Sequence, residues 1–216
     1  SHFEEFKNAL YDFSYYMAVR YPSVEYWILY NEPNLPFAFL PQHPLPGGTL
    51  LNAYIELVYW PMADGLRSSG RNIKLVGPEL TLLDVENKFG SSVWLKDWVE
   101  PILEYYPNYF DVLSVHSYAV DANQTLEKMV VLKDALQKYP YATQRVWLTE
   151  FNFGTEKEKL TKTETHVFWN VLKMLEKQWW ERSYFFSFMS SLVHDDILRF
   201  GTPKPLFFWM KRLLLH

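Results

Sequence analysis

The sequence predicts an α/β fold, an incomplete TIM-type (β/α) barrel with about five parallel strands. Five short apolar runs alternate with longer segments of helical periodicity, which is typical of repeated strand and helix units. The predicted strands start at residues 25, 73, 110, 145 and 183, so the intervals between starts are 48, 37, 35 and 38 residues. A closed eight-stranded barrel takes about 250 residues. This chain has 216, and only five strands are found in it.

The predicted elements alternate regularly along the chain. The strands span residues 25–30, 73–77, 110–116, 145–150 and 183–188. The helices span residues 3–20, 49–70, 91–105, 123–139, 161–180 and 204–215. Tyr21-Pro22 ends the first helix, Gly70 takes a C-cap position after the second, and Thr161 and Glu164 form a capping box. We expect residues 1–216 to form a single truncated barrel domain with a catalytic role.

Five parallel strands cannot close a normal barrel, so two strand edges and part of the apolar inner face need cover. The loop over residues 35–48 carries Phe37, Phe39 and several prolines, an apolar composition that indicates contact with a ligand or a partner. We therefore expect a homodimer, and light scattering across a dilution series tests it. The alternative is a monomer whose sheet collapses into a tighter curl.

The composition argues against several function classes. A net charge of -4 without a basic run argues against nucleic-acid binding, and no segment is apolar enough to indicate a membrane span. The absence of cysteine excludes disulfides, thiolate catalysis and cysteine-ligated zinc. His194-Asp195-Asp196 has metal-binding residue types but no spaced partner, so we expect an exposed loop there and no metal or other cofactor. Gly47-Gly48-Thr49 lacks a P-loop lysine and indicates a loop followed by an N-cap.

Two apolar strands each lead to a glutamate. The first runs Trp27-Ile28-Leu29-Tyr30-Asn31-Glu32-Pro33-Asn34, and the second runs Val146-Trp147-Leu148-Thr149-Glu150-Phe151-Asn152. Parallel α/β folds build their sites at the carboxyl ends of strands, so we expect the two carboxyl groups to face one another. A facing pair of carboxyl groups is what glycosidic bond hydrolysis requires. Taken alone, each glutamate would more simply be an N-cap or one half of a surface ion pair.

These motifs resemble the glycoside hydrolases of clan A, and in particular the xylosidase-like and iduronidase-like branches. In that family the fourth strand ends in Asn-Glu-Pro and the seventh ends in the nucleophilic glutamate. The segment from Phe110 to Tyr118 is similar to the sixth strand, and Lys204-Pro205 is similar to the start of the last helix. The five strands would then be strands four to eight of the full barrel. The eighth strand departs from the family, because Tyr184-Phe185-Phe186-Ser187-Phe188 lacks the usual tryptophan.

The resemblance implies a retaining glycosidase that cleaves β-glycosidic bonds by double displacement. Glu32 would be the acid/base and Glu150 the nucleophile. Asn31 would bind the sugar 2-hydroxyl, and His116 and Tyr118 would flank the nucleophile. The residues expected to bind the carbohydrate substrate are thus Asn31, His116, Tyr118 and Asn152.

Two other functions remain open. One is a catalytically weak carbohydrate-binding or interaction protein derived from such an enzyme, and the other is one half of a barrel that another chain completes. Two residues also have alternative roles. His116 is either part of the site or a satisfied core residue, and Glu79 either reaches the cleft or lies in an exposed loop.

Overall fold

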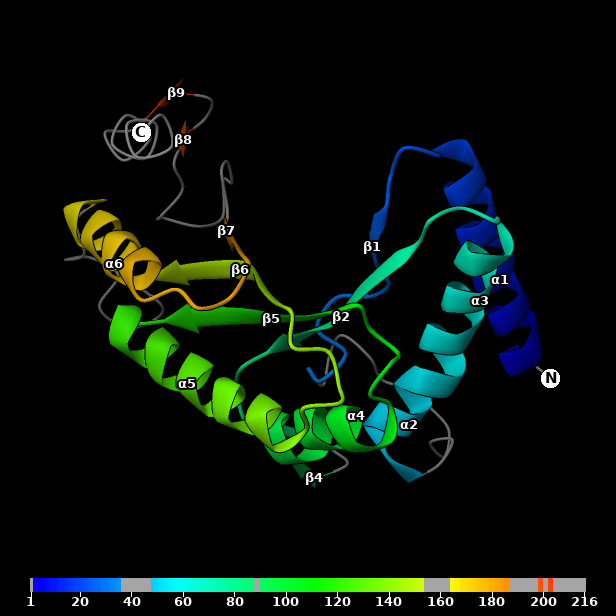
Figure 1. Cartoon of the computed structure of the whole chain (residues 1–216), viewed down its shortest axis with the longest axis horizontal. Coiled ribbons are helices and arrows are strands. Elements are labelled where there is room, and N and C mark those ends of the chain that lie inside the picture. Colours follow the sequence, from blue (N-terminus) through cyan, green and yellow to red (C-terminus); the bar gives the residue numbers. More distant parts are fainter. Residues whose placement is uncertain are drawn as a thin grey trace. The chain divides into compact units, whose positions relative to one another are not determined.

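The computed structural model describes residues 2–35, 48–87, 90–153, 164–186, 198–199 and 202–203. Five parallel strands form one sheet in the order β1-β2-β5-β6-β7, and helices alternate with them along the chain (Figure 1). This confirms the predicted incomplete TIM-type (β/α) barrel. The strands are β1 (Tyr26–Ile28), β2 (Lys74–Thr81), β5 (Val112–Ala119), β6 (Val146–Phe153) and β7 (Arg182–Phe185). Two small antiparallel pairs are β3 (Val85–Asn87) with β4 (Gly90–Ser92), and β8 (Leu198–Arg199) with β9 (Thr202–Pro203).

The helices fall close to the predicted positions. They are α1 (His2–Arg20), α2 (Leu50–Tyr54), α3 (Trp60–Ser68), α4 (Glu100–Tyr105), α5 (Ala122–Lys138) and α6 (Glu164–Glu176). The hydroxyl of Thr49 caps α2 by accepting from the Asn52 N–H at 3.1 Å, and Gly70 follows α3 with a left-handed φ of 70°. Both caps were predicted. Thr161, the last predicted helix at 204–215 and most of the 35–48 loop lie outside the described residues.

Two helices contain a wider π-helical segment that the sequence analysis did not predict. These are η2 (Ile55–Tyr59) between α2 and α3, and η3 (Trp94–Val99) before α4. In both cases the helix that follows has a proline as its second residue, Pro61 in α3 and Pro101 in α4. Proline has no N–H to donate to the carbonyl four residues earlier, so a locally wider turn accommodates it. The predicted start of the third helix at residue 91 is wrong, because Gly90–Ser92 forms β4.

Three central strands are longer than predicted. β2, β5 and β6 each have 8 residues and continue past the first polar residue, to Thr81, Ala119 and Phe153. Glu150 is therefore an internal residue of β6, and the prediction that this strand ends in a glutamate is wrong. The polar residues do not stop the strands, although the register of β6 with β7 shifts between Leu148 and Phe151.

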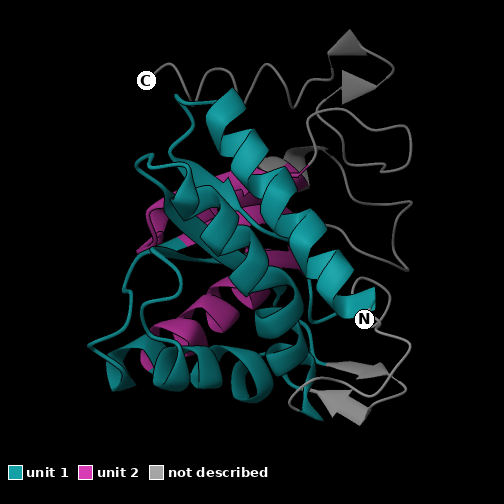
Figure 2. Ribbon diagram, turned by 90° about the vertical axis from the view of Figure 1, so that its right-hand side faces the viewer, with its two compact units in different colours: residues 1–115, 135–146 teal, residues 116–134, 147–216 magenta. Residues whose placement is uncertain are grey.

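The chain consists of two compact units. Unit 1 comprises residues 1–115 and 135–146, and unit 2 comprises residues 116–134 and 147–216 (Figure 2). The single-domain expectation therefore stays a prediction. In unit 1 α1 packs closely on α3, and a Cβ added at Gly65 would lie only 2.3 Å from the Tyr11 carbonyl oxygen. In the part of the chain that the structure describes, no helix is long and apolar enough to cross a membrane.

Candidate active site

Glu32 lies in the loop that follows β1, in unit 1, and its backbone has a left-handed φ of 47°. Its N–H donates to the Glu79 carbonyl at 3.0 Å, and its own carbonyl accepts from the Leu35 N–H at 3.0 Å. A left-handed conformation is costly for a residue with a Cβ, and such residues persist only where the surroundings fix them. The main chain of the half-buried Glu32 is thus held by hydrogen bonds of both its N–H and its carbonyl.

Asn34 ties the same loop to the end of β2. Its side chain is fully buried, its Nδ2 donates to the Thr81 carbonyl at 2.8 Å, and its Oδ1 accepts from the Thr81 N–H at 3.1 Å. One side-chain amide therefore pairs with both backbone groups of Thr81, as a neighbouring strand would. Sequence analysis placed Asn34 in a motif but assigned it no function, because its partner lies 47 residues away.

Glu79 is a buried carboxylate within β2. It is 2% exposed and has a φ of 60°, and its N–H donates to the Ser114 hydroxyl at 3.1 Å. The alternative of an exposed loop carboxylate is therefore wrong. Burial, then the charges of Tyr59 and Glu79, raise the pKa of Tyr54 well above its ordinary value.

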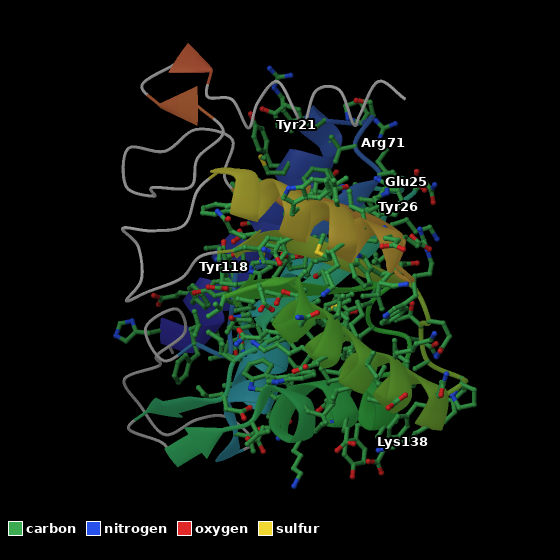
Figure 3. All side chains as sticks on the ribbon, turned by 90° about the vertical axis from the view of Figure 1, so that its left-hand side faces the viewer. Tyr21, Glu25, Tyr26, Arg71, Tyr118 and Lys138 are labelled. Atoms are coloured by element: carbon green, nitrogen blue, oxygen red, sulfur yellow. The ribbon has the colours of Figure 1, made fainter. Side chains whose placement is uncertain are left out.

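Glu150 is held by side chains on the neighbouring strand β5, within unit 2. The Tyr118 hydroxyl donates to Oε2 of Glu150 at 2.5 Å, and Nδ1 of His116 lies 3.6 Å from the same oxygen. Tyr118 is labelled in Figure 3. His116 and Tyr118 are two positions apart on β5, so their side chains share one face of the sheet. The side chain of His116 is fully buried, while that of Glu150 keeps 25% of its surface exposed. A partly open carboxylate with fixed partners is a suitable nucleophile.

Asn152 lies two residues further along β6 and is 3% exposed. Its Nδ2 donates to the Phe186 carbonyl at 2.6 Å, and its Oδ1 accepts from the Phe153 N–H at 2.7 Å. The Phe186 ring in turn packs edge-on against Tyr118, with ring centroids 5.9 Å apart. The amide of Asn152 thus bonds to the main chain, and its role in substrate binding stays a prediction.

The predicted site residues fall into two sets, one in each unit. Asn31 and Glu32 lie in unit 1, where Asn31 is exposed to solvent. His116, Tyr118, Glu150 and Asn152 lie together in unit 2. Within the described ranges, no group of three or more His, Cys, Asp or Glu side chains is arranged to hold a metal ion. The His194-Asp195-Asp196 segment lies outside those ranges.

Solved structures share the fold. An endo-β-1,3-glucanase of family GH128 from Amycolatopsis mediterranei, solved with laminaritriose, is 18% identical, with a TM-score of 0.59 over 87% of this chain and 72% of its own. A GH39 β-xylosidase from Caulobacter crescentus is 14% identical, with a TM-score of 0.71 over 99% of this chain and 47% of its own. A glucosidase from Croceicoccus marinus is 13% identical, with a TM-score of 0.51 over 76% of this chain and 32% of its own.

The chain thus spans about half the length of the xylosidase and a third of the glucosidase. A comparison with curated proteins found no match. A family model described as "Glycosyl hydrolase catalytic core" matches residues 5–205, most of the sequence. This match confirms the resemblance to the clan A glycoside hydrolases, and with it the predicted enzyme class at the level of the family. The chain belongs to the family of glycosyl hydrolase catalytic cores.

Proposed function

We propose that this chain hydrolyses β-glycosidic bonds with retention of configuration, with Glu150 as the nucleophile and Glu32 as the acid/base. The observation that carries the proposal is the environment of Glu150, whose Oε2 accepts from the Tyr118 hydroxyl at 2.5 Å and lies 3.6 Å from Nδ1 of His116. Both side chains lie against Oε2 of Glu150. We therefore assign the attack on the sugar to the other oxygen, Oε1.

The reaction proceeds by two displacements. In the first, Oε1 of Glu150 bonds to the anomeric carbon, the glycosidic C–O bond breaks, and Glu32 gives its proton to the leaving oxygen. In the second, Glu32 takes a proton from water, the water oxygen bonds to the anomeric carbon, and the Glu150 ester bond breaks. Glu32 regains its proton and Glu150 its charge.

The two side chains beside Glu150 suit the nucleophile's task. A phenol that donates to a carboxylate stabilises its charged form, which is the form that attacks. His116 is fixed by complete burial and so limits the movement of the Glu150 carboxylate. Since both lie on β5, the strand beside β6, the sheet itself sets the positions of all three side chains.

The substrate class we propose is a β-linked carbohydrate. The glucanase was solved with laminaritriose and the second relative is described as a β-xylosidase, so both similar structures support β-linked sugars. Asn31 and Asn152 remain proposed sugar contacts, and a homodimer remains the proposed assembly.

A second candidate function is a weakly active carbohydrate-binding protein, or one half of a barrel completed by another chain. The observation that favours it is the sheet of five parallel strands in the described part of the chain, since a closed barrel has eight. Turnover that requires an added partner would favour the half-barrel, and sugar binding without turnover would favour the binding protein.

The test is a panel of aryl β-glycosides with the wild type and the Glu150→Gln variant. The proposal predicts release of aryl alcohol by the wild type alone, with a first product that nuclear magnetic resonance identifies as the β-anomer. An α-anomer would contradict retention, and equal release by Glu150→Gln would remove Glu150 from catalysis.

A further inference from the structure

We propose that Asn34 is a positioning residue for Glu32: its buried amide fixes the left-handed backbone that carries the acid/base. The consequence of this inference for catalysis rests on the proposed function. Its structural part concerns only residues of unit 1, in the β1 loop and strand β2.

The geometry after β1 shows why the loop needs an anchor. β1 ends at Ile28, whose partner on β2 is Val76. Beyond it, the Glu32 N–H still bonds to the Glu79 carbonyl of β2, but the left-handed backbone of Glu32 turns the chain away from a regular strand. A residue in this conformation needs further contacts to hold it.

Asn34 supplies the next contacts with β2, beyond Glu32. Two hydrogen bonds, at 2.8 Å and 3.1 Å, fix its amide against the Thr81 backbone, and its complete burial excludes water as a competitor. Only Pro33 separates it from Glu32, whose N–H bonds to the Glu79 carbonyl. The Thr81 and Glu79 contacts thus hold the loop on both sides of Pro33 and offset the cost of the left-handed Glu32.

The test compares three variants. Asn34→Ala removes both bonds, and Asn34→Asp keeps the acceptor for the Thr81 N–H but places a carboxylate against the Thr81 carbonyl. The matched control is Asn72→Ala. Asn72 also donates its Nδ2 across 47 residues, to Glu25 at 3.0 Å, but at the opposite end of the same strand pair and in an exposed position.

The first measurement is hydrogen exchange of the Glu32 and Leu35 amides by nuclear magnetic resonance, which needs no catalytic activity. Asn34→Ala should lower the protection of both amides by about tenfold or more, while Asn72→Ala should leave them unchanged. Unchanged protection in a folded Asn34→Ala variant would overturn the proposal. Asn34→Asp should lose protection near neutral pH and regain it at low pH, because a protonated carboxyl can donate to the Thr81 carbonyl. The wild type at each pH is the reference for every other effect of pH on these two amides.

The second measurement compares aryl β-glycosides with good and poor leaving groups. If Asn34 acts through Glu32, Asn34→Ala should reduce kcat for poor leaving groups by about tenfold more than for good ones, because only the poor ones need protonation. An equal loss on both would contradict a role through Glu32. A wild type without turnover would refute the proposed function, whereas the exchange measurement would still decide whether Asn34 fixes the Glu32 backbone.

Discussion

The two glutamates of the proposed pair are held in different ways. Glu32, in unit 1, follows a strand and has a left-handed backbone fixed by main-chain bonds to Glu79 and by Asn34 two residues later. Glu150, in unit 2, is an internal residue of β6, at a point where the register with β7 shifts between Leu148 and Phe151, and its carboxylate lies against the side chains of Tyr118 and His116. The contacts described for Glu32 are thus those of its backbone, and the contacts described for Glu150 are those of its carboxylate.

This difference separates the two chemical tasks. A nucleophile must keep its charge and its attacking oxygen in place, so direct hydrogen bonds to the carboxylate suit it. An acid/base must both release and accept a proton. The main-chain bonds of Glu32 do not depend on the charge of its carboxyl, so they can hold its backbone in both protonation states.

The largest expected effect belongs to Glu150. Replacing it by alanine removes the atom that bonds to the sugar, so turnover of aryl β-glycosides should fall by about 10⁴-fold or more. Added azide should restore turnover and yield the α-glycosyl azide, because the small anion attacks in place of the missing carboxylate. Residual activity within tenfold of the wild type would place the nucleophile elsewhere.

Glu32→Ala should cause a loss that depends on the substrate. With a good leaving group the first step needs little protonation, so the loss should be smaller than with a poor leaving group, by about 10²-fold. Azide should rescue the second step and yield the β-glycosyl azide. A matched loss on both kinds of substrate would show that Glu32 is not the general acid.

Tyr118→Phe should have a moderate effect. It removes one hydrogen bond to a charged group, so kcat should fall by about 10- to 100-fold, and the pH profile of kcat/KM should shift because the carboxylate loses a donor. Tyr184→Phe is the control in the same unit, since that exposed hydroxyl accepts a bond at 3.4 Å from Arg182. Identical pH profiles for wild type and Tyr118→Phe would remove Tyr118 from the site.

The smallest effect on the rate is expected for Tyr59→Phe in unit 1. The hydroxyl of Tyr59 donates to the Tyr109 carbonyl, and burial raises the pKa of Tyr59 to about 12. The unfolded chain ionises first, near pH 10, so this group stabilises the fold below that pH and the stability is lost as pH rises from about 10 to 12.

Urea unfolding of both proteins at pH 8 and pH 11 measures this effect. Between pH 8 and pH 11 the free energy of unfolding should fall by roughly 1 kcal/mol more in the wild type than in Tyr59→Phe. The rate on aryl glycosides at neutral pH should change less than twofold. A rate loss as large as that of Tyr118→Phe would contradict the separation between a structural and a catalytic hydroxyl.

The strand and helix alternation was predictable because apolar runs and helical periodicity are local signals. The lengths of β2, β5 and β6 were not, because a polar residue such as Glu79, His116 or Glu150 looks like the end of a buried strand. In each case the strand continues, since neighbouring strands satisfy its backbone.

The two parts of the candidate site also differ in how well the sequence predicts them. The placement of His116 and Tyr118 beside Glu150 was implied by the family resemblance, and the two-residue period of side chains accounts for the face that His116 and Tyr118 share on β5. The anchoring of Glu32 could not be predicted, because the side-chain amide of Asn34 bonds to Thr81, 47 residues away, and a contact at that separation has no local sequence signal. The left-handed backbones of Glu32 and Glu79 also carry no sequence signal, since neither residue is a glycine.

The most direct test of the proposed pair is the separation of the two carboxyl groups in a crystal structure, which requires no knowledge of the sugar. The account predicts that the Glu32 and Glu150 carboxyls lie about 5–5.5 Å apart, as double displacement requires. A separation of about 6.5–9.5 Å would indicate an inverting enzyme instead. A pair more than about 10 Å apart would contradict the shared role of Glu32 and Glu150 in glycoside hydrolysis.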